Sequence, residues 1–94
     1  MKDKLLQIIN HYGVMKQLKY IHSEYYELDE AILKSYDTMY DFEIEHIAEE
    51  IADVMVMLKQ FQYYWEIKDN EIEKIMEQKI DRQIERIKDD RTNR

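Results

Sequence analysis

The sequence predicts an all-α protein, a four-helix, bundle-like chain that is completed by oligomerisation. Its 94 residues include no Pro and a single Gly, Gly13, so the turn residues that hairpins and sandwiches need are missing. Hydrophobic residues make up 45% of the chain, too many for a disordered chain despite 37% charged residues. Apolar residues also recur at helical spacing along most of the chain. A chain of this length has room for one core, and we expect a single domain over 1–94.

We expect four helices, at about 3–12, 14–34, 42–66 and 70–90. Gly13 suits the end of the first helix as a C-cap. The second helix has a predicted core stripe at spacings of three and four, formed by Leu18, Ile21, Tyr25, Leu28 and Ile32. The stretch 35–41 loses this period and is predicted to be a loop. The third and fourth helices have the stripes Ile44, Ile47, Ile51, Val54, Leu58 and Ile72, Ile75/Met76, Ile80, Ile84, Ile87.

One segment of the third helix predicts contacts beyond a single chain. Residues 51–58 read IADVMVML and are apolar on every side of a helix except at Asp53. A helix that is apolar all round is buried all round. Four helices of this length can hardly cover it alone, so we expect a homo-oligomer. The sequence leaves a homodimer and a homotetramer both open.

Composition and charge exclude several classes of protein. The chain has no Cys, so it forms neither disulfides nor thiolate metal sites. Its longest uncharged apolar run is Val54–Leu58, far below the ~20 residues of a membrane span, and it shows no signal peptide, so a cytoplasmic protein is expected. The net charge of −7 lies entirely in residues 1–67, and residues 68–94 are neutral. This charge disfavours nucleic acid as a partner and favours a multivalent cation.

Two carboxylate pairs lie beside the predicted apolar stripes. Glu24 and Glu27 are three residues apart on the second helix, and Glu50 and Asp53 repeat that spacing on the third. Residues at i and i+3 are neighbours on a helix surface. Carboxylates near a buried face are costly unless a partner compensates their charge. Oxygen ligands suit a hard divalent cation, and we expect these four residues to hold one or two ions of Mg²⁺, with Mn²⁺ as the alternative.

Cations on the fourth helix add a second element to this site. Lys79 lies at the edge of the apolar stripe, and Arg82 and Arg86 follow it at i+3 and i+7. If the fourth helix packs across the carboxylate helices, these side chains project towards the metal. A metal with nearby Lys and Arg residues is typical of a polyphosphate site. Ordinary surface ion pairs on the same helix are the alternative.

Three segments of the chain together resemble the motifs of a known family. The string HYGVMKQLKYIHSEYYELDEAI looks like the E-x-x-E helix of the MazG-like all-α nucleoside triphosphate pyrophosphohydrolases. The string HIAEEIADVMVML is similar to the family's E-x-x-D helix, and EIEKIMEQKIDRQIERI resembles its closing helix. The resemblance covers about residues 12–88. It departs from the family pattern at Ser23, where the first motif often has a doubled Glu.

The resemblance implies a reaction and roles for residues. It implies Mg²⁺ held by Glu24, Glu27, Glu50 and Asp53, and cleavage of a nucleoside triphosphate to the monophosphate and pyrophosphate. Lys79 and Arg82 would contact the phosphates. Glu24 and Glu50 are the expected catalytic residues; Glu24 or Glu49 would take the proton from the attacking water. Candidates for contact with the nucleobase are Gln17, His22 and Tyr20.

Two rival interpretations deserve comparison. A di-iron bundle is suggested by Glu43 and His46, an E-x-x-H pair, but that architecture needs a second such pair, which neither His11 nor His22 supplies. The other is a non-catalytic acidic adaptor or inhibitor that binds a basic partner through its −7 charge. Such a protein would place its acids on exposed faces. The four carboxylates border the apolar stripes instead, so the enzyme is the favoured hypothesis.

Overall fold

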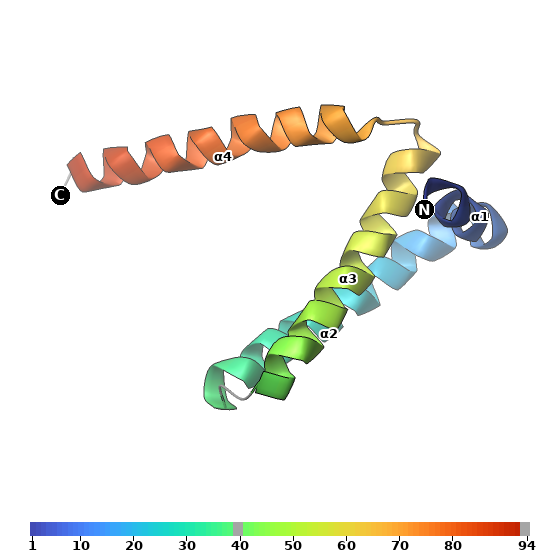
Figure 1. Cartoon of the computed structure of the whole chain (residues 1–94), viewed down its shortest axis with the longest axis horizontal. Helices are drawn as coiled ribbons and strands as arrows, with labels where there is room; N and C mark the ends of the chain where they lie inside the picture. The colour runs from blue at the N-terminus through green and yellow to red at the C-terminus, as the bar shows by residue number, and fades with distance from the viewer. Residues whose placement is uncertain (39–40, 93–94) are drawn as a thin grey trace.

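The computed structural model describes residues 1–38 and 41–92, and within them it has four helices and no strand. Helix α1 spans Lys2–Tyr12, α2 spans Val14–Thr38, α3 spans Asp41–Tyr64 and α4 spans Asp69–Thr92 (Figure 1). The predicted all-α, four-helix fold is confirmed. The predicted loop at 35–41 is wrong for residues 35–38, which continue α2, and for Asp41, which begins α3; residues 39 and 40 lie outside the described residues. Ser35 Oγ donates a hydrogen bond to the carbonyl oxygen of Ile32 at 2.8 Å, so its hydroxyl is satisfied without ending the helix.

Gly13 ends α1, as the sequence predicts. Its φ angle is 90°, a region that glycine enters at little cost and that other residues avoid. Its N–H donates to the carbonyl oxygen of Ile9 at 2.8 Å, and its own carbonyl accepts from the N–H of Gln17 at 3.1 Å. One residue therefore closes α1 and opens α2, and it allows α1 to turn back across the following helices.

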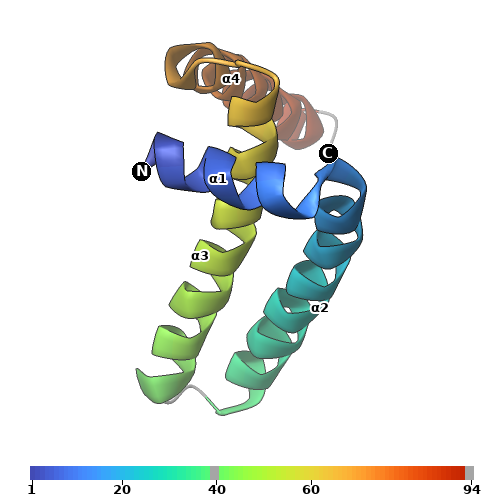
Figure 2. The ribbon, with the colours of Figure 1, turned by 90° about the vertical axis from the view of Figure 1, so that its right-hand side faces the viewer.

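Helices α2 and α3 form an antiparallel pair, and α1 crosses both of them near the end where α2 begins and α3 finishes (Figure 2). The core runs between α2 and α3, and α1 covers it at one end. Its buried apolar residues are Leu5 and Ile9 of α1, Ile21 and Ala31 of α2, and Val54 and Met57 of α3. Within the described residues, none of the helices combines the length and the apolar composition needed to cross a membrane.

On both α2 and α3, three of the five residues of the predicted core stripe lie outside this core. On α2, Leu18, Tyr25 and Ile32 are 43–46% exposed, and the buried face runs instead through Gln17, Ile21, Glu24 and Ala31. On α3, the exposed members are Ile44, Ile51 and Leu58. The physical reason is that each helix has an apolar arc wider than the strip that one neighbouring helix can cover. Within one chain, the predicted core stripes are therefore wrong for these six residues.

Helix α4 leaves the other three helices. It projects from the end of α3 on the side of the α2–α3 pair that is opposite to α1 (Figures 1 and 2). Its first residue is anchored, because Asp69 accepts hydrogen bonds from Lys59 Nζ at 2.7 Å, Gln62 Nε2 at 2.8 Å and Tyr63 Oη at 2.9 Å. Beyond this anchor, α4 packs against none of α1, α2 and α3 over the described residues.

We expect that Ile9→Ala lowers the free energy of unfolding by about 2–5 kcal/mol, the usual range for deleting a buried Ile side chain. Ile9 is fully buried in the core, and it holds α1 against the pair. Urea unfolding followed by circular dichroism measures the change. Asn10→Ala, on the exposed side of the same helix, is the matched control and should change stability little. Equal losses in the two variants would contradict the packing described for α1.

Candidate metal centre

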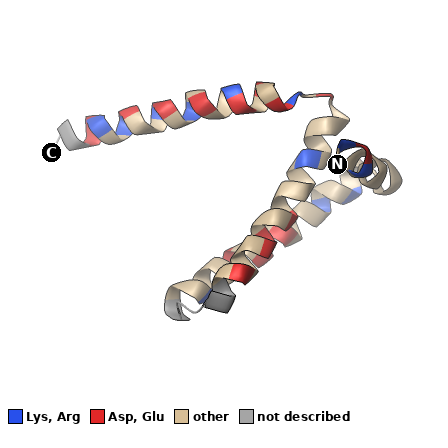
Figure 3. Cartoon of the chain, in the orientation of Figure 1, with Lys and Arg blue, Asp and Glu red and all other residues tan. Residues whose placement is uncertain are grey.

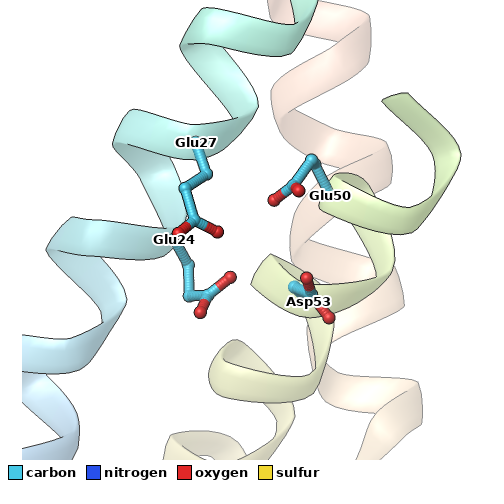
Figure 4. A group of neighbouring side chains, drawn as sticks. All are labelled: Glu24, Glu27, Glu50 and Asp53. Carbon is cyan, nitrogen blue, oxygen red and sulfur yellow. The ribbon is translucent and has the colours of Figure 1, made fainter. Parts of the chain in front are cut away.

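Four carboxylates converge between the middles of α2 and α3. Glu24 and Glu27 come from adjacent turns of α2, and Glu50 and Asp53 come from adjacent turns of α3 (Figure 4). One carboxylate oxygen from each residue lies within 4.8 Å of one from each of the others. The antiparallel pairing brings the two i, i+3 pairs together, because each pair lies near the centre of its helix. The predicted meeting of these four residues is what the structure shows.

Burial divides the four carboxylates into two kinds. Glu24 and Glu50 are only 6% and 8% exposed, whereas Glu27 and Asp53 are exposed. Among the described residues, neither Glu24 Oε2 nor Glu50 Oε2 has a hydrogen-bond partner, although both atoms are buried. A buried acceptor without a partner is costly, and a buried charge is more so. These two oxygens are the features of the fold that most require a ligand.

The raised pKa values of Glu24 and Glu50 also indicate that these two buried carboxylates lack a compensating charge. Burial raises the pKa of Glu24, and the nearby charges of Glu27 and Asp53 raise it further. Burial and the same two neighbours also raise the pKa of Glu50, while His46, whose Nε2 lies 3.9 Å from Glu50 Oε1, acts in the opposite direction. A divalent cation bound among the four carboxylates would offset both causes of the raised pKa values, because it compensates the negative charge and replaces the hydration lost on burial.

The raised pKa values predict how stability depends on pH when no metal is bound. The folded chain holds protons on Glu24 and Glu50 at pH values where the unfolded chain has lost them. By linkage, the free energy of unfolding falls as pH rises from about 4.5 through the raised pKa values. In the presence of a chelator, lowering the pH from about 7 to about 5 should therefore increase stability.

Urea unfolding at several pH values, with and without Glu24→Gln/Glu50→Gln, isolates this contribution. The double variant removes both groups and leaves His46 and the exposed acids in place. We expect the wild type to gain more stability on acidification than the variant does. Equal pH profiles would show that the two buried carboxyl groups titrate at ordinary values.

A cavity of about 430 Å³ adjoins the carboxylates, with Glu24 and Asp53 in its wall. The remaining lining residues are Ile8, Tyr12, Lys16, Gln17, Tyr20, Val56, Met57 and Gln60. Two of them are buried amides, because Gln17 is 6% exposed and Gln60 is 1% exposed. Gln17 Nε2 donates to Gln60 Oε1 at 2.8 Å, and Gln60 Nε2 lies 3.6 Å from the sulfur of Met57. Sulfur is a weak acceptor, so the amide group of Gln60 keeps hydrogen-bonding capacity towards the cavity.

The cavity also has aromatic and cationic parts. Tyr12 and Tyr20 line it, and Lys16 Nζ lies 5.1 Å from the centre of the Tyr12 ring. The carboxylate of Glu24 raises the pKa of the Tyr20 hydroxyl. A ligand whose anionic end meets a cation at the carboxylates could thus place a flat, polar ring between tyrosines and amides.

The structure brings together most of the predicted site, with clear exceptions. The four carboxylates, Gln17 and Tyr20 share one region of the molecule. His22 and Glu49 are exposed, and neither is a member of the carboxylate cluster or the cavity wall. Lys79 and Arg82 lie on α4, which does not pack near the carboxylates within one chain. Their predicted contact with phosphates stays a prediction.

Sequence reasoning missed Lys16 and Gln60. A signal existed for Lys16, because Lys16, Tyr20 and Glu24 are spaced four apart and so follow one side of α2 towards the carboxylates. Gln60 is seven residues after Asp53, which is two turns along the same side of α3. Both residues resemble ordinary surface positions in a charge-rich helix, but the structure places exposed Lys16 in the cavity wall and buries Gln60.

The chain matches no protein-family model, no curated protein and no solved structure.

Proposed function

We propose that this chain is a metal-dependent nucleoside triphosphate pyrophosphohydrolase, in which Glu24, Glu27, Glu50 and Asp53 bind Mg²⁺ or Mn²⁺. The observation that carries the proposal is the pair of buried carboxylate oxygens, on Glu24 and Glu50, that lack a partner among the described residues. Four oxygen ligands with no sulfur and no imidazole suit a hard cation. The resemblance of the helical motifs to the MazG-like enzymes supports this reaction over other uses of a carboxylate-bound metal.

The cavity supports a nucleotide as the ligand. Its position beside the carboxylates allows the triphosphate to meet the metal while the nucleoside lies between Tyr12, Tyr20 and the Gln17–Gln60 amide pair. Lys16 is close enough to the same wall to pair with a phosphate. Lys79 and Arg82 keep their assignment to the phosphates from the resemblance alone.

The proposed chemistry divides among the residues of the chain. Bound Mg²⁺ would neutralise phosphate oxygens and lower the pKa of a coordinated water. Glu24 would bind the cation together with the other three carboxylates and would also accept the proton of the attacking water, since its side chain lines the cavity. Glu27, Glu50 and Asp53 hold the cation in place. The water oxygen forms a bond to the α-phosphorus as the bond from that phosphorus to the α–β bridging oxygen breaks, so the products are a nucleoside monophosphate and pyrophosphate. This reaction implies a cytoplasmic protein, because nucleoside triphosphates are kept there.

A substrate panel tests the proposal. Purified protein is incubated with each canonical ribo- and deoxynucleoside triphosphate and with oxidised or deaminated ones, in Mg²⁺ or Mn²⁺, and pyrophosphate release is measured. We expect release from at least one member, and none in excess chelator. The matching nucleoside monophosphate should appear in equal amount. Absence of release from every member with either metal would overturn the proposed reaction.

A further inference from the structure

Gln17 of α2 and Gln60 of α3 form a buried amide pair in the wall of the cavity. Gln17 is 6% exposed and Gln60 is 1% exposed, and Gln17 Nε2 donates a hydrogen bond to Gln60 Oε1 at 2.8 Å. Burying two amides between helices costs free energy unless their polar atoms find partners. An apolar pair would fill the same space without that cost, so the amides indicate a ligand that forms hydrogen bonds with them.

The sulfur of Met57 decides which way both amides point. Gln60 Nε2 lies 3.6 Å from Met57 Sδ, and Gln17 Nε2 lies 4.0 Å from it. A thioether accepts hydrogen bonds weakly and donates none, so it favours N–H groups over carbonyl oxygens as neighbours. If both amides turned over, the hydrogen bond between them would persist in the opposite direction, but two oxygens would face the sulfur. Met57, which is buried, therefore decides between two otherwise equivalent arrangements.

This orientation leaves one acceptor and one donor for a ligand. Gln17 Oε1 accepts no hydrogen bond from the described residues, and it is not one of their fully buried atoms without a partner. Because the side chain lines the cavity, this oxygen is open to it. The second N–H of Gln60 Nε2 is likewise unused among the described residues. The amide pair thus offers an acceptor beside a donor to a ring in the cavity.

The distribution of charge places an uncharged ring at the amides. Residues 14–23 of α2 and 54–65 of α3 include no Asp or Glu, whereas the acids gather further along both helices (Figure 3). A polyphosphate that is bound through a cation therefore lies with the acids, and the uncharged part of the ligand lies with the amides. Tyr12 and Tyr20, which also line the cavity, supply aromatic faces for a ring.

Nucleobases divide into two groups by the edge that such an amide pair would meet. Cytosine and adenine carry an exocyclic amino group, which is a donor, next to a ring nitrogen that accepts. Uracil, thymine, guanine and hypoxanthine carry a carbonyl oxygen next to a ring N–H, which is the reverse order. The first order matches the acceptor of Gln17 and the donor of Gln60. The second order opposes like groups at both positions.

We propose that the Gln17–Gln60 pair, oriented by Met57, selects nucleotides of the amino bases cytosine and adenine over their oxo counterparts. The inference rests on the proposed function for its ligand, a nucleotide. Met57 is a positioning residue in this assignment, because it acts on the base through the two amides.

Nucleoside monophosphates, the products of the proposed reaction, allow the preference to be measured at equilibrium. Isothermal titration calorimetry in Mg²⁺ compares CMP with UMP and AMP with IMP, since the members of each pair differ only at the edge in question. We expect the amino member to bind at least about 10-fold more tightly in at least one pair, as for a matched contact to a base edge. Equal dissociation constants within both pairs, a preference for UMP or IMP, or no binding of any of the four would overturn the proposal.

Met57→Leu tests the role of the sulfur. Leucine keeps the approximate volume and apolar character of the side chain but offers no acceptor, so the amides can adopt either arrangement. We expect the ratio of the UMP and CMP dissociation constants to fall towards 1, chiefly because UMP binds better. Met55→Leu makes the same change at an exposed position of α3, and it should keep the wild-type ratio. An unchanged ratio in Met57→Leu would overturn the orientation of the amides by the sulfur.

The side-chain amide signals of the wild type give a measurement that needs no folded variant. In ¹⁵N-labelled protein, saturating CMP should shift the side-chain signals of Gln17 and Gln60, because both amides gain a partner. Gln7 and Gln78 are exposed and lie outside the cavity wall, so their signals should stay in place. CMP that binds without moving the signals of Gln17 and Gln60 would overturn the proposal.

These measurements involve no turnover, so the two proposals can fail separately. Preferential binding of CMP or AMP without pyrophosphate release from any triphosphate would reject the reaction and keep the selection of amino bases. Pyrophosphate release together with equal binding within both pairs would reject the selection and keep the reaction.

Discussion

Glu50→Gln should abolish pyrophosphate release, lowering kcat/KM by more than about 100-fold, the upper limit typical for loss of a residue that only supports a metal ligand. Glu50 has a buried oxygen that no other described residue satisfies, so it is expected to bind the metal directly. Glutamine keeps the shape of the side chain but offers one neutral oxygen. Steady-state kinetics on the best substrate of the panel measure the effect.

Two controls separate chemistry from folding. Glu49→Gln makes the same change at the preceding, exposed residue of α3, and it should retain near wild-type activity. Metal-free Glu50→Gln should be at least as stable as the wild type at pH 7, because it removes a carboxylate whose pKa is raised chiefly by burial. An active Glu50→Gln enzyme would rule out the assigned role. An inactive and unfolded one would contradict the predicted stability.

Mg²⁺ or Mn²⁺ should raise the melting temperature of the wild type strongly. A ligand at ~100 times its dissociation constant stabilises the folded state by about 2.7 kcal/mol. For a domain of this size, that corresponds to an increase of roughly 10–20 °C. Differential scanning calorimetry against a chelator baseline gives the shift. The same ionic strength of NaCl is needed as a reference, because any salt screens the repulsion among the acids.

Glu24→Gln should remove most of that shift, since it replaces the second buried ligand. The matched control is Glu30→Gln, an exposed position on the same helix outside the carboxylate cluster. Its response to metal should equal that of the wild type. If neither cation changes the wild-type midpoint beyond the NaCl reference, the metal centre is wrong and the acidic adaptor becomes the better hypothesis.

Much of the fold follows from local features that can be recognised in the sequence. Gly13 ends α1, and periodicity marks all four helices. The end of α2 was predicted too early because Ser35 resembles a loop residue, although its hydroxyl bonds back to Ile32. Periodicity could not decide which part of a wide apolar arc faces the core. That choice depends on where α1 crosses, which places Ile21 inside and Tyr25 outside.

The residues of the candidate site could likewise be predicted only in part. The two carboxylate pairs could be predicted, because each i, i+3 pair lies near the centre of its helix and borders the apolar stripe that faces the other helix. Gln60 could not, because a Gln near the end of a charge-rich helix is usually exposed. The direction of α4 was also beyond the sequence. It depends on the left-handed backbone at Glu66 and on the bonds of Asp69, which are long-range consequences of where α3 ends.

Asp69, which anchors α4, and the two buried carboxyl groups of the candidate metal centre respond to acid at different pH values. Hydrogen bonds from Lys59, Gln62 and Tyr63 lower the pKa of Asp69 to about 2. Its contribution to stability is therefore complete above the ordinary value of 3.8 and is lost only as the pH falls from there through about 2. Glu24 and Glu50 take up protons at higher pH, because their pKa values are raised. Mild acid would thus neutralise the buried carboxylates of the candidate metal centre first, while the joint that sets the direction of α4 keeps its geometry.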